Sequence, residues 1–98
     1  MNEFMMDITF PELLTEEFVS LVPQQRAQVN KLFTDGKLSS YALALDRSKL
    51  WVTMLAETEE DVVVILSTFP LRKFMDVKIH RLAFAESANA NVARISMN

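Results

Sequence analysis

The sequence STFPLRKFMDVKIHRLAF, residues 67–84, joins a helix end, a Phe-Pro turn and a final amphipathic strand. Pro70 has no backbone N–H and a fixed φ angle, so a preceding helix must end near it. After the turn, residues 75–84 alternate as a strand does, which places Lys78 and His80 on the same face. His80 is the only histidine in the chain. The stretch predicts a helix followed by a strand, and the fold depends on the elements that precede them.

The first part of the chain predicts a strand and a long helix. Residues 3–10 are rich in Phe, Met, Ile and Thr, and Pro11 ends this strand. The helix begins near Thr15 and carries apolar side chains at helical spacing. Pro23 either kinks this helix or marks the first turn of its main section. Gly36, the only glycine, stands where a left-handed C-terminal cap is required.

The middle of the chain predicts a hairpin and a second helix. Residues 37–46 and 49–57 have strand composition, and the Asp-Arg-Ser connection at 46–48 is short enough for a hairpin. Thr58 is followed by Glu-Glu-Asp, which resembles a capping box at a helix start. The apolar run at 62–66 fits either a helix or a buried strand, and the cap favours the helix.

The resulting element order is β-α-β-β-α-β. This order is typical of the ferredoxin-like fold, an α+β arrangement with two helices on one face of a four-stranded antiparallel sheet. A chain of 98 residues has room for one domain. We assign residues 1–84 to this domain. The polar segment 85–98 is rich in small residues and is either a tail or an oligomerisation arm.

Alternation along the strands separates two faces of the sheet. One face is wholly apolar and suits the side beneath the helices: Phe4, Met6, Ile8, Ala42, Ala44, Val52, Met54, Val77 and Ile79. The second face mixes large apolar and polar groups: Met5, Asp7, Thr9, Tyr41, Leu43, Leu45, Trp51, Thr53, Leu55, Lys78, His80 and Leu82. A sheet surface in water usually turns polar, and this one does not. We therefore expect a homodimer in which two such faces pack together as a dimeric α+β barrel.

The chain resembles the muconolactone isomerase family. The similarity is clearest over residues 28–36, a helix end with its glycine, and over residues 66–77, LSTFPLRKFMDV, which precede the last strand. The resemblance implies a small dimeric α+β barrel that assembles into larger rings. It also implies an isomerase reaction in which a proton moves across an enol-lactone. The hairpin departs from the family pattern because it has no glycine between its strands.

The second face carries the candidate site. His80 and Asp7 could act as an acid–base pair, and Lys78 could stabilise a substrate carboxylate or an enolate oxygen. The candidate substrate-binding residues are Tyr41, Trp51 and Thr53. In the alternative interpretation, Asp7 and Lys78 form a cross-strand ion pair and His80 is an interface residue.

These two interpretations of the second face predict two different functions. The first is a small-molecule isomerase that acts by proton transfer on an unsaturated lactone or a related carboxylated ring. The second is a non-catalytic oligomeric binding or structural module, in which bulky side chains fill the barrel.

Composition argues against several other classes of protein. A net charge of −3 and a pI near 5.0 disfavour nucleic acid, which attracts basic surfaces. With no cysteine, one histidine and one glycine, we expect no disulfide, no metal site, no phosphate loop and no cofactor. No apolar run approaches the about 20 residues of a membrane span, and the start of the chain is unlike a secretory signal. We therefore expect a cytoplasmic protein that does not bind membranes.

Overall fold

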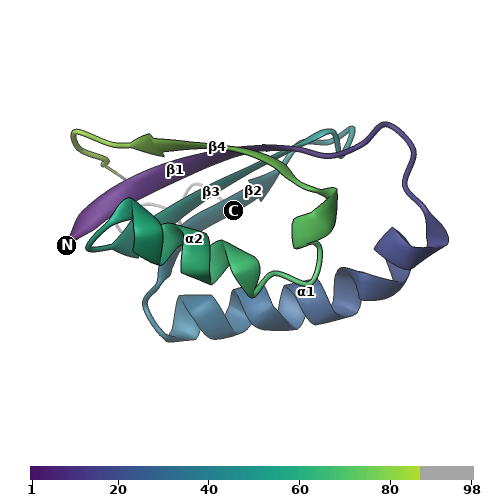
Figure 1. Cartoon of the computed structure of the whole chain (residues 1–98), viewed down its shortest axis with the longest axis horizontal. Coiled ribbons are helices and arrows are strands. Elements are labelled where there is room, and N and C mark those ends of the chain that lie inside the picture. The colour runs from purple at the N-terminus through teal and green to yellow at the C-terminus, as the bar shows by residue number, and fades with distance from the viewer. Residues whose placement is uncertain (87–98) are drawn as a thin grey trace, which may run out of the picture.

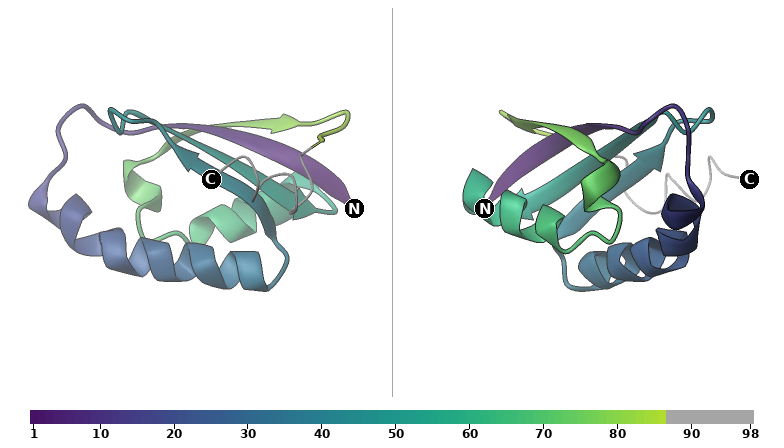
Figure 2. Two further views of the ribbon diagram at one scale, coloured as in Figure 1. Left: turned by 180° about the vertical axis from the view of Figure 1, so that it is seen from behind. Right: turned by 45° about the vertical axis from the view of Figure 1, so that its right-hand side comes forward.

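The computed structural model describes residues 1–86, which form a four-stranded sheet with two helices on one side (Figure 1). The elements are β1 (Asn2–Thr9), α1 (Glu16–Thr34), β2 (Leu38–Leu43), β3 (Lys49–Ala56), α2 (Glu59–Ser67), the short 3-10 helix η1 (Arg72–Phe74) and β4 (Asp76–Arg81). All strand pairs are antiparallel, in the order β2-β3-β1-β4. Two further views show both helices on the same face (Figure 2). The predicted ferredoxin-like fold is confirmed, whereas the predicted tail or arm lies almost wholly outside the described residues.

Both helices begin beside the threonines that the sequence indicated as caps. The Thr15 hydroxyl oxygen accepts a hydrogen bond from the backbone N–H of Phe18 at 3.2 Å. The Thr58 hydroxyl oxygen accepts from the backbone N–H of Asp61 at the same distance. Each bond satisfies an N–H group that has no partner within its helix. The apolar run at 62–66 is helical, as the cap favoured.

The end of α1 is closed by a backbone motif centred on Gly36. This residue has a φ angle of 74°, in the left-handed region. Its N–H bonds to the carbonyl oxygen of Phe33 at 3.0 Å, and the N–H of Lys37 bonds to that of Leu32 at 2.9 Å. These two bonds define a Schellman cap, which favours glycine at the left-handed position. Pro23 lies inside α1, and the helix continues on both sides of it.

The hydrophobic core lies between the helices and the sheet. The side chains of β1 and β3 that the sequence assigned to this face are at most 2% exposed: Phe4, Met6, Ile8, Val52 and Met54. Helix α2 contributes Val62 and Leu66 to the same core, and β4 packs against its edge through Val77 and Ile79. The predicted core face is therefore confirmed for β1, β3 and β4.

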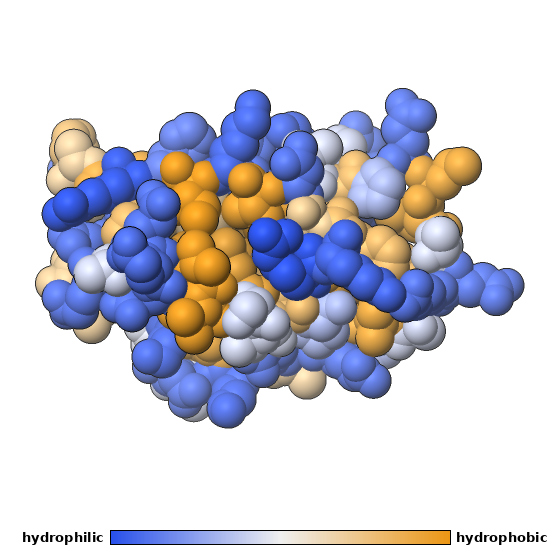
Figure 3. Space-filling model, viewed as in Figure 1, coloured by the Kyte–Doolittle hydropathy of each residue, from blue (hydrophilic) through white to orange (hydrophobic). Residues whose placement is uncertain are grey.

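Helix α2 is apolar on its outer side as well. Val63 and Val64 are 51% and 64% exposed. Figure 3, drawn from the side seen in Figure 1, shows hydrophobic residues among hydrophilic ones. Neither helix within residues 1–86 is long and apolar enough to cross a membrane.

The side chains of β2 point the opposite way from the sequence prediction. Tyr41 pairs with the core residue Val52, and Leu43 lies on the same helix-facing side. Ala42, predicted for the core, pairs with Trp51 on the open face of the sheet. The prediction that placed Tyr41 on the open face is therefore wrong.

The cause of this reversal is the length of the hairpin turn. The sequence prediction joined the two strands through residues 46–48. In the structure, the N–H of Ala44 bonds to the carbonyl oxygen of Lys49 at 2.8 Å, so the turn comprises residues 45–48. Because strand side chains alternate with a period of two, one additional turn residue moves the side chains of residues 40–43 to the other face. Leu38 stays in the core, because the register shifts between Leu38 and Ser40.

The open face is less apolar than the sequence predicted. Trp51 and Leu55 remain on it, but two of the β2 residues assigned to it face the helices instead. Leu45 lies in the hairpin turn and is 93% exposed. Among the described residues, this face therefore exposes less apolar surface than predicted, and burying it in an interface would contribute less free energy.

Candidate functional site

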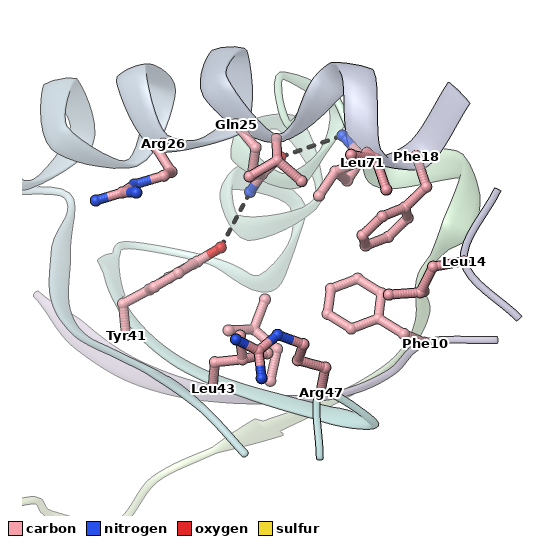
Figure 4. Close-up of a pocket in the computed structure, with 12 residues that line it drawn as sticks. Phe10, Leu14, Phe18, Gln25, Arg26, Tyr41, Leu43, Arg47 and Leu71 are labelled. Atoms are coloured by element: carbon pink, nitrogen blue, oxygen red, sulfur yellow. Dashed lines mark hydrogen bonds between the residues drawn. The ribbon is translucent and has the colours of Figure 1, made fainter. Parts of the chain in front are cut away.

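A cavity of about 450 Å³ lies between α1 and the sheet, near the turn that joins β2 to β3 (Figure 4). Its volume is within the range of small-molecule sites. It is lined by Phe10, Leu14, Phe18, Val19, Val22, Gln25, Arg26, Tyr41, Leu43, Arg47, Leu50 and Leu71. Most of these side chains are apolar, with one amide, one phenol and two guanidinium groups among them. Such a lining suits a small, largely apolar ligand with a few polar atoms.

One wall of the cavity is aromatic. The rings of Phe10 and Phe18 have centroids 5.3 Å apart and planes at 84°, and Phe18 meets Phe74 at the same distance and 73°. Edge-to-face contacts of this kind hold the rings in fixed orientations. Phe10 and Phe18 are both buried. They therefore form a firm apolar surface against which a flat ring can pack.

A polar pair faces this wall. Gln25 is 2% exposed, and its side-chain Nε2 donates a hydrogen bond to the Tyr41 hydroxyl oxygen at 3.3 Å. Its Oε1 accepts a hydrogen bond from the backbone N–H of Leu71 at 3.1 Å. Figure 4 shows Tyr41 extending from β2 toward Gln25 on α1. The amide thus connects the helix to β2 and to the turn after Pro70.

Burial raises the pKa of the Tyr41 hydroxyl above its ordinary value, and the hydrogen bond from Gln25 opposes this effect more weakly. A tyrosine phenol is protonated at neutral pH, and desolvation disfavours the phenolate further. Tyr41 is therefore a hydrogen-bond donor in this cavity rather than a base.

Positive charge lies at the border of the cavity. Arg26 on α1 and Arg47 in the hairpin turn both line it and are exposed to solvent. The Arg47 Nη1 donates to the carbonyl oxygen of Leu45 at 2.9 Å, and Figure 4 shows its guanidinium at the edge of the space between Tyr41 and Phe10. Within residues 1–86, no carboxylate or histidine lines this cavity. Two guanidinium groups without a carboxylate beside them make this border electrostatically favourable for negative charge.

The other five residues predicted for the site lie on the open face of the sheet, in two adjacent rows. Asp7 on β1 stands between Trp51 of β3 and Lys78 of β4. In the next row, Met5 stands between Thr53 of β3 and His80 of β4. Asp7 and His80 are therefore diagonal neighbours across β1 and β4. The structure brings these five residues together, and it separates them from Tyr41 by the thickness of the sheet.

Asp7 has an ion-pair partner different from the one that the sequence suggested. Its Oδ1 lies 3.1 Å from the Lys49 Nζ, which also donates to the Thr9 hydroxyl at 2.9 Å. Lys78 lies opposite Asp7 in the register but is not its ion-pair partner among residues 1–86. The predicted alternative of an Asp7–Lys78 ion pair is therefore wrong.

The remaining residues of the open face differ in accessibility. His80 is exposed on the edge strand β4, and Trp51 is 40% exposed. Thr53 is only 5% exposed, and its hydroxyl accepts a hydrogen bond from Ser40 at 2.6 Å. Across residues 1–86, no cluster of three or more His, Asp or Glu side chains could hold a metal ion.

Apart from Tyr41, the residues that build the cavity were not predicted from the sequence, although two of them gave a signal. Gln25 occupies a position in the apolar stripe of α1, between Phe18 and Val29 at helical spacing. A polar side chain at such a position must find a partner inside the protein, because a buried amide without one is costly. Arg47 gave a weaker signal. It lies in the hairpin connection, where the family pattern has a glycine and this chain has none.

The fold and the cavity together define a ferredoxin-like α+β protein with a small-molecule-sized site between its first helix and its sheet. No protein-family model and no curated protein matches the chain. Among solved structures, it is similar to 5-chloro-2-hydroxyhydroquinone dehydrochlorinase (TftG) from Burkholderia phenoliruptrix AC1100, in complex with 2,5-dihydroxybenzoquinone. The TM-score is 0.71 over 85% of this chain and 95% of that one, with 13% sequence identity. At this identity the likeness shows the fold alone.

Proposed function

We propose that this protein belongs to the muconolactone isomerase-like class and binds a small molecule. The ligand is a flat, oxygen-bearing anion that occupies the cavity between α1 and the sheet. The observation that carries the proposal is the Tyr41 hydroxyl, hydrogen-bonded to Gln25 in an apolar cavity that Arg47 borders. The aromatic wall would contact the ring of the ligand. The two polar groups would contact its oxygens.

The chemistry that this arrangement supports best is stabilisation of a negatively charged oxygen. A phenol held in a desolvated site donates a stronger hydrogen bond to an enolate than to a neutral carbonyl, which is the requirement for lowering the barrier to enolate formation. The guanidinium of Arg47 adds favourable charge. Since the lining side chains include neither a carboxylate nor an imidazole, the cavity supports binding and enolate stabilisation rather than proton abstraction.

Titration with 2,5-dihydroxybenzoquinone, the ligand of the structural neighbour, tests this proposal. We expect saturable binding to the wild-type protein, detected by calorimetry. Tyr41→Phe should weaken binding by roughly tenfold, the usual value of one hydrogen bond to a charged group. Thr34→Val also removes one hydroxyl, at the exposed end of α1, and should bind as the wild type does. Equal affinity of Tyr41→Phe and wild type would show that the cavity is not the site.

A second candidate function is the predicted isomerase, with its site on the open face. The observation in its favour is the pair of rows that places Asp7, Lys78 and His80 on neighbouring strands. In this proposal His80 and Asp7 move the proton, Lys78 stabilises the enolate oxygen, and Trp51 and Thr53 contact the substrate. In this proposal the sheet of a second subunit encloses the face in a homodimer, and such dimers assemble into a larger ring.

The two candidates separate in a turnover assay with an unsaturated lactone that carries a carboxylate. For the open-face isomerase, His80→Ala should abolish turnover and leave the oligomer intact by light scattering. Tyr41→Phe should leave that turnover unchanged. Quinone binding in the cavity with no lactone turnover would instead identify a non-catalytic binding module.

A further inference from the structure

The hydrogen bond between Leu71 and Gln25 fixes the orientation of the Gln25 amide. The backbone N–H of Leu71 can only donate, so the atom of Gln25 that faces it at 3.1 Å must be the carbonyl oxygen Oε1. The amide NH₂ must then face Tyr41, as the 3.3 Å contact from Nε2 to Oη shows. Gln25 is 2% exposed, so water does not compete for either end.

This orientation determines which part of the Tyr41 hydroxyl faces the cavity. A phenol hydroxyl lies in the plane of its ring and offers two in-plane directions, one with the proton and one with a lone pair. Gln25 occupies the lone-pair direction, because it donates to Tyr41. Within residues 1–86, the bond from Gln25 is the only one made by the Tyr41 hydroxyl, so no acceptor takes its proton there. The proton is therefore directed toward the ligand space.

We infer that Gln25 is a positioning residue that makes the cavity selective for ligands presenting a hydrogen-bond acceptor, a carbonyl or enolate oxygen, to Tyr41. This inference rests on the proposed function of the cavity and specifies its ligand class. If a ligand presents an N–H donor at this position, its hydrogen faces the Tyr41 proton, and neither donor has an acceptor. Binding sites reject this type of mismatch most strongly, because a buried donor is left unpaired. Arg47 selects for negative charge elsewhere on the same molecule.

Two probes that differ in one group measure this selectivity. Para-formylbenzoate and para-aminobenzoate share a ring and a carboxylate, but the first offers an acceptor and the second a donor at the opposite end. We expect the wild type to bind the formyl compound about tenfold more tightly, as one net hydrogen bond predicts.

Gln25→Glu should reverse the polarity of the Tyr41 hydroxyl. The carboxylate can still accept from the Leu71 N–H, but it must also accept from Tyr41, so Tyr41 would present its lone pair to the cavity. The tenfold preference for the formyl compound should then disappear or invert. The added charge weakens both benzoates alike, so the ratio of their affinities is the informative quantity. Gln28→Glu adds the same charge on α1 outside this cavity and should keep the wild-type ratio.

A second readout follows the hydroxyl directly. Tyr41 is the only tyrosine, so the ultraviolet absorbance of tyrosinate reports its titration alone. A neighbouring carboxylate that holds the phenol proton should raise the pKa of Tyr41 in Gln25→Glu, whereas Gln28→Glu should leave it as in the wild type. If the titration shifts and the ratio of affinities does not, the inference is overturned while the proposed binding site stands.

The remaining outcomes are also decisive. If Gln25→Glu does not fold, Tyr41→Phe replaces it, and a formyl preference that persists without the hydroxyl overturns the inference. If neither benzoate nor the quinone binds the wild type, the proposed function falls and the inference falls with it. Binding of both benzoates with equal affinity to the wild type overturns the inference alone.

Discussion

Arg47 has a backbone conformation that few residues of its type adopt. Its φ angle is 64°, and it is the only residue other than glycine with a positive φ among residues 1–86. A side chain in this region costs roughly 1–2 kcal/mol unless it is asparagine or aspartate, which tolerate it better. Its guanidinium lines the cavity. Strained residues are frequent at ligand sites, and this strain is consistent with a role for the side chain in binding.

The first prediction concerns stability and binding at this residue. Arg47→Asn should raise the free energy of unfolding by up to about 1 kcal/mol, because asparagine accepts the left-handed conformation. The same variant should bind 2,5-dihydroxybenzoquinone about threefold more weakly, because one favourable charge is lost. Urea unfolding and calorimetry measure the two quantities.

Lys31→Gln is the matched control for Arg47→Asn. It removes one positive charge from α1 at a position outside the cavity and should leave quinone binding unchanged. If Arg47→Asn is less stable than the wild type, the hydrogen bond from Arg47 to the Leu45 carbonyl outweighs the backbone strain.

The second prediction concerns the titration of Tyr41. Its pKa is raised in the folded state, so folding favours the protonated form. This stabilisation is fully present below the unfolded value of 10.0 and is lost as the pH rises through the higher folded value. Between pH 10.0 and the higher folded value, the unfolding free energy of the wild type should therefore fall more steeply with pH than that of Tyr41→Phe. Parallel slopes for the two proteins would contradict a raised pKa for the half-buried Tyr41 phenol.

At the scale of the elements, the termination of α1 depends on one backbone conformation. Gly36 has a φ angle of 74°, and a Cβ added there would meet no atom within 4 Å. Any effect of a side chain is thus due to backbone strain and not to a clash with a neighbour. The left-handed conformation allows the Schellman bonds that close the helix and start β2.

The third prediction follows from this geometry. Gly36→Ala should lower the free energy of unfolding by about 1 kcal/mol, and Gly36→Asn by less, because asparagine adopts the left-handed region more readily. Urea unfolding of both variants measures the difference. Equal stability of the alanine variant and the wild type would show that the cap does not need a glycine.

At the scale of the whole molecule, association through the open face of the sheet is the principal prediction. Trp51 lies near the middle of this face, opposite Asp7 and Ala42, and is 40% exposed in a single chain. In the proposed homodimer its ring would be buried. Aromatic residues at the centre of an interface commonly contribute most of its binding energy.

The fourth prediction tests this assembly. The wild type should be a dimer or a multiple of one by light scattering, and Trp51→Glu should shift it to the monomer, because a buried unpaired charge is costly. Leu45→Glu makes the same kind of change at a residue that is 93% exposed in the hairpin turn, and it should leave the dimer intact. A monomeric wild type would refute the covered open face.

The sequence by itself determined the features that depend on short stretches of chain. Thr15 and Thr58 begin helices because their hydroxyls bond three residues ahead, and Gly36 ends a helix because of its own backbone. The order of elements and the core faces of β1, β3 and β4 followed from local periodicity in the same way. Residues 67–84 gave the helix end, the Pro70 turn and the last strand, which the structure confirms.

Only the tertiary structure decided the orientation of β2 and the location of the cavity. One additional residue in the hairpin turn moved Tyr41 from the open face to the helix side, and a turn length read from composition is uncertain by at least one residue. The contact among Gln25, Tyr41 and Leu71 joins residues 16 and 46 positions apart. Such contacts arise when the helix packs on the sheet, so no local pattern predicts them. The turn after Pro70, which helped to identify the fold, supplies the N–H that orients Gln25.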